Sequence, residues 1–116
     1  MRNASDPPGS GLPHGQRRTV PRYSLIATAE VVEPTTGAQM SGRISEISRK
    51  GCYIDVLNTL PVDTVVQLSV TRDNGSFTTM ARIIYVQEGL GMGMAFVDPA
   101  EDQLRILDLW LTELAV

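Results

Sequence analysis

The stretch Leu90-Gly91-Met92-Gly93-Met94-Ala95-Phe96-Val97-Asp98-Pro99-Ala100-Glu101 contains the point where a strand pattern changes to a helix pattern. Large and small side chains alternate over 90–97, and this period of two predicts a β-strand with one bulky and one nearly bare face. Asp98 then suits the N-cap of a helix, and Pro99 suits its first position. We therefore predict a last strand over 90–97 and a helix over 98–115. The bulky face of the strand would consist of Leu90, Met92, Met94 and Phe96.

The predicted C-terminal helix is amphipathic. Its apolar residues recur at helical spacing, so they form one stripe that needs a partner surface. Leu109 falls on the charged side instead, where a single exposed leucine carries little information. The helix is therefore expected to pack on the strands through Leu104, Leu107, Leu111 and Leu114, with Ile106 and Trp110 beside them.

Five further strand patterns precede the last strand. Each is a short run of apolar and β-branched residues bounded by turn-forming residues, of which Asp73-Asn74-Gly75 is the strongest hairpin signal. Six short strands followed by one helix predict a mainly β domain, an antiparallel barrel or split barrel with the helix packed on it. The five strands are expected over 24–32, 39–48, 51–56, 66–70 and 77–86.

The second of these strands contains a conflict in its alternation. Ile44 and Ile47 both have the character of core residues, yet three positions apart they would face opposite sides of a regular strand. A β-bulge near Ser45 and Glu46 would let both point inward. The bulge would then aim Glu46 and Ser48 outward, toward the N-terminal arginines.

The charge of the chain is unevenly distributed. The net charge is −3, but 1–22 carries four arginines and one aspartate, whereas 98–116 carries one arginine and five acids. Net attraction to DNA, RNA or an anionic membrane is therefore not expected. Because 1–16 is rich in proline and glycine and nearly free of apolar residues, we predict a flexible tail there and one domain over 17–116.

The basic arm Arg17-Arg18-Thr19-Val20-Pro21-Arg22 joins the tail to the strands. It holds three of the ten basic residues and no acid. The guanidinium fork of arginine matches a phosphate or the edge of a guanine in bidentate fashion, so such an arm suggests capture of an anionic, planar ligand. A solubilising basic linker is the alternative, and the arm by itself favours that interpretation. Within the domain, the barrel would then cover 23–97.

The sequence lacks the residues that several kinds of catalytic and metal-binding site require. His14, the only histidine, lies in the tail, and Cys52 is the only cysteine, so neither a nucleophile with its base nor a zinc site is expected. The run Gly89-Leu90-Gly91-Met92-Gly93 lies inside a predicted strand, where its glycines favour close packing over a phosphate-binding loop. We therefore expect no enzyme and no cofactor. The absence of a signal peptide or transmembrane stretch makes the cytoplasm the default location.

Two motifs together resemble those of the PilZ domain family. Arg18-Thr19-Val20-Pro21-Arg22 resembles the family's R-x-x-x-R motif, with Arg17 as the additional arginine that often precedes it. Glu46-Ile47-Ser48-Arg49-Lys50-Gly51 resembles the second motif, D/N-x-S-x-x-G. The glycine-rich last strand and the C-terminal helix also fit, so the resemblance covers about 17–114.

The resemblance implies a six-stranded antiparallel β-barrel that binds the bacterial second messenger cyclic di-GMP. Arg17, Arg18 and Arg22 would grip the phosphates and contact the guanines of this ligand. Glu46 would pair with a guanine edge. Ser48 would contact the ligand from its strand, and Gly51 would leave room for it. Ligand binding would order the arm and change the surface presented to a partner protein that the sequence does not identify.

Glu46 departs from the family motif, which has aspartate or asparagine at that position. The longer side chain keeps the acceptor but moves the carboxylate outward by one methylene. The competing hypothesis is therefore a PilZ-like adaptor with a degenerate motif, which acts through protein contacts without nucleotide. An oligonucleotide-binding barrel ranks third, because such barrels use aromatic side chains on a basic groove and this chain has few aromatics and a net negative body.

Overall fold

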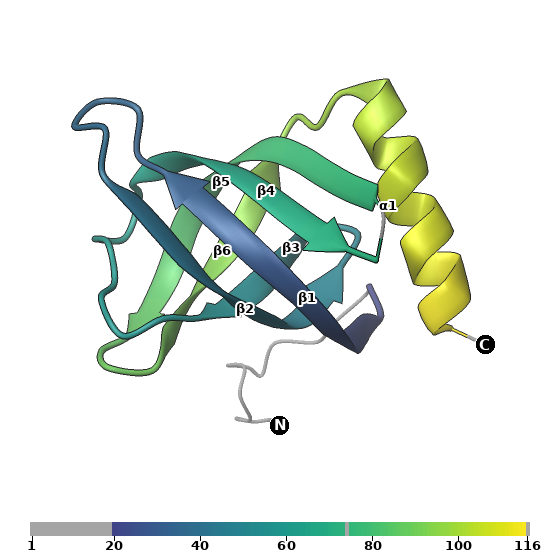
Figure 1. Ribbon diagram of the computed structural model, residues 1–116, viewed down its shortest axis with the longest axis horizontal. Coiled ribbons are helices and arrows are strands. Elements are labelled where there is room, and N and C mark those ends of the chain that lie inside the picture. The colour runs from purple at the N-terminus through teal and green to yellow at the C-terminus, as the bar shows by residue number, and fades with distance from the viewer. Residues whose placement is uncertain (1–19, 74, 116) are drawn as a thin grey trace, which may run out of the picture.

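The computed structural model describes residues 20–73 and 75–115, and these form a closed barrel of six strands with one helix (Figure 1). All strand pairs are antiparallel, and the order around the barrel is β1-β2-β3-β6-β5-β4. The predicted fold is therefore confirmed, and closure excludes the split-barrel alternative. The elements are β1 (Arg22–Val32), β2 (Gln39–Ser48), β3 (Gly51–Asp55), β4 (Val65–Arg72), β5 (Gly75–Gln87), β6 (Gly91–Val97) and α1 (Glu101–Leu114).

The core fills the interior of the barrel with alternate residues from every strand. Because successive side chains of a strand point to opposite faces, alternate positions of a regular strand enter the core, and a β-bulge changes which positions these are. The closed barrel leaves no free sheet edge. The largest fully buried side chains include Phe77, Ile44, Ile47, Ile54, Leu68, Ile83, Met92 and Met94.

Two turns connect neighbouring strands of the barrel. β4 and β5 form a hairpin that stays paired up to Arg72 and Gly75, as the Asp73-Asn74-Gly75 signal predicts. Between β1 and β2, the carboxylate of Glu33 accepts hydrogen bonds from the backbone N–H groups of Thr35 and Thr36, at 3.0 and 2.8 Å. The hydroxyl of Thr36 also donates to this carboxylate, at 2.6 Å, and it and the two backbone bonds lower the pKa of Glu33, since they favour its charged form.

The last strand begins one residue later than predicted. Met92 and Met94 are buried as expected, but Leu90 lies in the turn before β6 and is exposed, so its assignment to the bulky face was wrong. A turn residue is free of the strand's alternation, and the backbone N–H of Leu90 donates to the carbonyl of Gln87, at 3.0 Å.

The helix also begins later than predicted, at Glu101. Asp98 is not its N-cap: Asp98 has a φ of +42°, and the N-cap is Ala100, which makes no side-chain capping bond. A tertiary contact instead ties the first turn of the helix to the barrel, because the side-chain oxygen of Gln103 accepts a hydrogen bond from the backbone N–H of Thr78 in β5, at 2.7 Å. The predicted first position, Pro99, therefore lies outside the helix.

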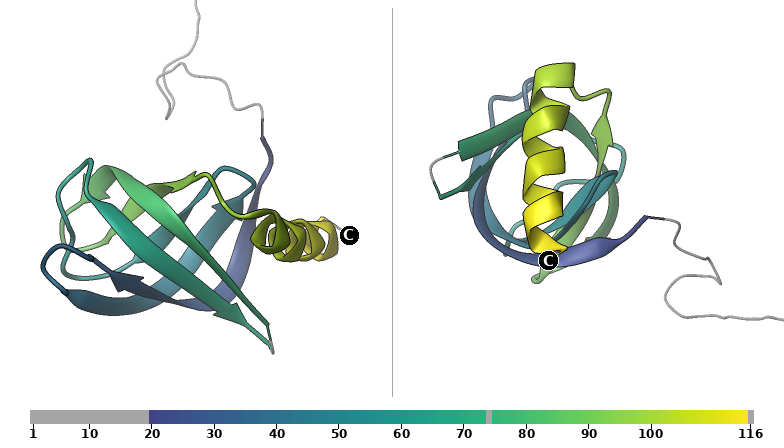
Figure 2. Two further views of the ribbon diagram at one scale, coloured as in Figure 1. Left: turned by 90° about the horizontal axis from the view of Figure 1, so that it is seen from above. Right: turned by 90° about the vertical axis from the view of Figure 1, so that its right-hand side faces the viewer.

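Helix α1 lies across one end of the barrel (Figure 2, right). Leu107 and Trp110 are buried there, and the ring of Phe77 meets the Trp110 ring edge to face, with centroids 6.5 Å apart. Leu109 is exposed, as its place on the charged side predicts. Among the described residues, no helix has both the length and the apolar character needed to span a bilayer.

Candidate ligand-binding site

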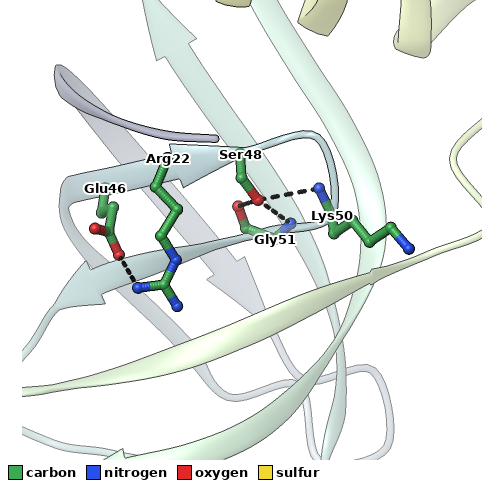
Figure 3. A network of polar contacts seen from close by, with 5 residues as sticks. All are labelled: Arg22, Glu46, Ser48, Lys50 and Gly51. Carbon is green, nitrogen blue, oxygen red and sulfur yellow. Dashed lines mark hydrogen bonds and ion pairs between the residues drawn. The ribbon is translucent and has the colours of Figure 1, made fainter. Parts of the chain in front are cut away.

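The corner between β2 and β3 is built around the hydroxyl of Ser48 (Figure 3). This oxygen accepts hydrogen bonds from the backbone N–H groups of Lys50, at 3.1 Å, and Gly51, at 3.2 Å. The hydroxyl lies 3.3 Å from the carbonyl oxygen of Gly51, to which it donates. Ser48 thereby closes the tight turn with its own side chain, as serine often does.

The expectation that Ser48 points outward was wrong. Ser48 is only 8% exposed, because its hydroxyl turns back onto the corner that it closes. Gly51 has a packing requirement of its own: a Cβ atom at this position would lie 2.1 Å from the carbonyl oxygen of Met94 in β6. Ser48 and Gly51 therefore shape the corner and let β6 approach it.

The bulge predicted in β2 is present. Relative to β3, one extra residue lies between Ile44 and Glu46, and both Ile44 and Ile47 are buried. The extra residue changes which positions face outward, so Glu46 projects from the outer face of the barrel. Sequence reasoning placed this side chain correctly.

Arg22 and Glu46 form an ion pair at the edge where β1 begins (Figure 3). The Nη1 atom of Arg22 lies 2.9 Å from Oε1 of Glu46, and the two side chains are 33% and 39% exposed. In the register of the strands, Arg22 lies opposite Ser48. The end of the basic arm therefore joins the barrel beside the second motif. Arg17 and Arg18 lie outside the described residues.

This ion pair is partly solvated, so its strength is modest. Exposed pairs of this kind contribute about 0–1 kcal/mol, because water screens both charges. A phosphate or a guanine edge could therefore replace either partner at small cost. The pair brings a cation and an acceptor together without locking them to each other.

Two features of the surroundings were not found from the sequence. Arg49, inside the second motif, pairs with Asp108 of α1, with Nε and Oδ1 2.9 Å apart, and so links the corner to the helix. Tyr53 lies opposite Glu46 in the register of β2 and β3. The strand register brings Tyr53 beside Glu46, and the packing of α1 on the barrel brings Asp108 to Arg49. No local sequence signal indicates either contact.

The site offers cations, a carboxylate and backbone groups. Within the described ranges 20–73 and 75–115, no cluster of three His, Cys, Asp or Glu side chains could hold a metal ion. Cys52 is buried, and burial raises the pKa of its thiol to about 12, so it remains protonated at neutral pH. An arginine beside a carboxylate suits recognition of an anionic ligand that also carries hydrogen-bond donors.

Comparison with protein families finds one match. The model of the PilZ domain family matches residues 16–113, which is most of the chain. No curated protein matches the chain.

Several solved structures share the fold. The PilZ domain of Escherichia coli YcgR with c-di-GMP has a TM-score of 0.73 and 16% identity, over 86% of this chain and 92% of that one. The complex of K. pneumonia MrkH with c-di-GMP has a TM-score of 0.74 and 19% identity, over 86% and 52%. The Bacillus subtilis inhibitor of motility MotI has a TM-score of 0.67 and 15% identity, over 82% and 49%. The chain thus spans about half the length of the MotI and MrkH chains.

Proposed function

The chain belongs to the PilZ domain family, and from that premise we propose that it is a receptor that binds cyclic di-GMP and passes this signal to a partner protein. The receptor would be non-catalytic. Proteins with the same fold have been solved with this ligand, namely the PilZ domain of YcgR and MrkH.

The observation that carries the proposal is the ion pair of Arg22 and Glu46. It places the last arginine of the first motif within 2.9 Å of the first residue of the second motif, at the edge from which the arm departs. Cyclic di-GMP has two phosphate charges and two guanines, whose N1–H and N2–H₂ groups donate hydrogen bonds. An arginine beside a carboxylate complements both kinds of group.

We assign the roles as follows. Arg17, Arg18 and Arg22 bind the phosphates and contact the guanines, and Glu46 accepts from a guanine edge. Ser48 and Gly51 act indirectly, since the hydroxyl of Ser48 is engaged in the turn and Gly51 allows the close approach of β6. Charge-assisted hydrogen bonds contribute roughly 1.5–3 kcal/mol each. Ordering the arm costs roughly 1–2 kcal/mol per residue in backbone entropy. Because this cost is comparable to the gain from the arginine contacts, the guanine contacts decide the affinity.

Isothermal titration with cyclic di-GMP tests this function. The native chain is expected to release heat and saturate, and Arg18→Ala and Arg22→Ala are each expected to bind at least tenfold more weakly. Arg105→Ala is the matched control, because Arg105 is an exposed arginine on α1. No heat at high protein concentration, with Arg18→Ala indistinguishable from the native chain, would remove the proposal.

A second candidate function is an adaptor that acts through protein contacts without nucleotide. The identity of Glu46 favours it, because this longer carboxylate stands where the family motif has aspartate or asparagine. If Glu46→Asp gains binding that the native chain lacks, the adaptor function is supported. Tight binding by the native chain contradicts it.

A further inference from the structure

A row of outward-facing residues crosses the barrel beside Glu46. In the strand registers, Glu46 of β2 lies opposite Tyr53 of β3, Tyr53 lies opposite Gly93 of β6, and Gly93 lies opposite Tyr85 of β5. Neighbouring strands are about 4.8 Å apart, so Tyr53 is the immediate neighbour of Glu46 and Tyr85 is two strands further. Two of the three tyrosines of the chain thus lie in one row with the carboxylate.

A bulge in β5 aims Tyr85 at this face. The register between β5 and β6 shifts between Ile83 and Tyr85, so that Ile84 is the extra residue. Ile83 is buried and Tyr85 is exposed, and without the shift Ile84 would occupy the position opposite Gly93. Bulges commonly re-aim a side chain beside a binding site.

The two tyrosine rings pack so closely on β6 that only glycine fits beneath them. A Cβ atom at Gly93 would lie 2.4 Å from Cε1 of Tyr85, and one at Gly91 would lie 2.6 Å from Cε1 of Tyr53. The predicted role of these glycines, close packing, is therefore confirmed. The alternation of the last strand thus leaves a bare face on which aromatic rings rest.

The rings form a fixed and accessible surface. Their centroids are 5.9 Å apart and their planes are inclined by 35°. The hydroxyl of Tyr53 donates a hydrogen bond to the side-chain oxygen of Gln87, which restrains its ring. Tyr85 nevertheless remains 42% exposed, so its side chain is accessible to a ligand.

We propose that Tyr53 and Tyr85 form an aromatic shelf on which one guanine of the ligand stacks while Glu46 accepts hydrogen bonds from its edge. This inference rests on the proposed function and names a further part of the same site. A base lying on the shelf would extend parallel to the barrel surface, and Glu46, at the end of the row, would meet its edge. Stacking on an aromatic ring is a strong and sequence-tolerant contact for a nucleic-acid base.

The test compares cyclic di-GMP binding by three variants at position 85. Stacking predicts that Tyr85→Ala raises the Kd about 5- to 150-fold, that Tyr85→Leu does the same, and that Tyr85→Phe stays within about twofold of native. Tyr53→Ala is expected to act in the same direction as Tyr85→Ala. Ile84→Ala is the matched control, since Ile84 is an exposed neighbour outside the row.

A thermal melt of each variant without ligand separates stacking from a structural role. We expect Tyr85→Ala and Ile84→Ala to melt within a few degrees of each other while only the former loses affinity. If the native chain binds and Tyr85→Ala binds equally well, the shelf is wrong and the receptor function stands. If the native chain does not bind at all, both proposals are overturned.

Discussion

At the scale of single residues, the second motif divides into a side chain that faces the site and others that shape it. Glu46 projects outward and pairs with Arg22, whereas Ser48 is buried and uses its hydroxyl to close the corner. From the sequence motif alone, Glu46 and Ser48 would both be expected to contact the ligand. A serine two residues from the proposed ligand contact therefore shapes the candidate site through the backbone that it holds.

Replacement of Gly51 tests this structural role. In Gly51→Ala, the new Cβ atom would press on the carbonyl oxygen of Met94, so we expect a loss of about 1–3 kcal/mol in the free energy of unfolding. Urea unfolding measures it. Gly75→Ala is the control, because a Cβ there would meet Trp110 only at an ordinary 3.8 Å, and a change within about 0.5 kcal/mol is expected. Equal losses in both variants would contradict the packing argument.

The thiol of Cys52 should be inert in the folded chain. Burial raises its pKa from 9.0 to about 12, so almost no thiolate is present at pH 8. We expect no reaction with a thiol reagent such as DTNB in buffer and one equivalent per chain in denaturant. Because the unfolded chain releases this proton near pH 9 and the folded chain retains it, stability should fall as pH rises from 9 toward 12. Rapid labelling of the native chain would show that the thiol is accessible.

At the scale of elements, two bulges determine which side chains the strands present at the candidate site. The bulge in β2 lets Ile44 and Ile47 both enter the core and turns Glu46 outward, and the bulge in β5 does the same for Tyr85. The first was predictable, because two core residues at a spacing of three break the alternation. The second was not, since Ile83, Ile84 and Tyr85 are all plausible core residues in sequence.

Helix α1 depends on packing for its stability, because its N-terminus has no side-chain cap. Leu107 is fully buried against the barrel, and Leu109 is exposed on the opposite side. We expect Leu107→Ala to lose about 2–5 kcal/mol in the free energy of unfolding, measured by denaturant titration. Leu109→Ala, an identical change on the same helix, should stay within about 0.5 kcal/mol. A large effect of Leu109→Ala in the isolated chain would place the helix in a different orientation.

At the scale of the whole molecule, barrel closure makes a stable platform for the arm. β1 pairs with both β2 and β4, and its pairing with β2 extends to its first residue, Arg22, which lies opposite Ser48 and beside Glu46. Two ion pairs tie helix α1 to this platform, Arg49 with Asp108 and Arg72 with Glu113, in addition to the hydrogen bond between Thr78 and Gln103. Arg49 belongs to the second motif, so the first of these pairs connects the candidate site directly to the helix.

Ligand binding should stabilise the whole domain. If cyclic di-GMP binds only the folded chain, a concentration one hundred times the Kd adds about 2.7 kcal/mol to the free energy of unfolding. For a domain of this size, that corresponds to a rise in Tm of roughly 10 °C. Thermal melts with and without ligand measure it. A tenfold weaker Kd leaves about 1.4 kcal/mol at the same ligand concentration, so the rise in Tm should fall to about half or less in Arg22→Ala. An unchanged rise there would exclude Arg22 from the site.

Much of the fold could be predicted because it depends on local patterns. Alternation of apolar side chains identifies the strands, turn residues locate the hairpins, and helical spacing identifies α1, since each of these signals lies within a few neighbouring residues. The errors fall where a tertiary contact replaces a local rule. The hydroxyl of Ser48 turned inward to its corner, and Gln103 anchored the start of α1 at β5 in place of a cap by Asp98.

By itself, the sequence determined the six strands, the terminal helix, the bulge at Glu46 and the residues of two short motifs. Only the tertiary structure decided that Arg22 meets Glu46, that Arg49 reaches α1 and that two tyrosines lie over the glycines of β6. The physical reason is register: which residues of distant strands face each other depends on bulges and barrel closure, and these arise from packing of the whole chain rather than from any local pattern.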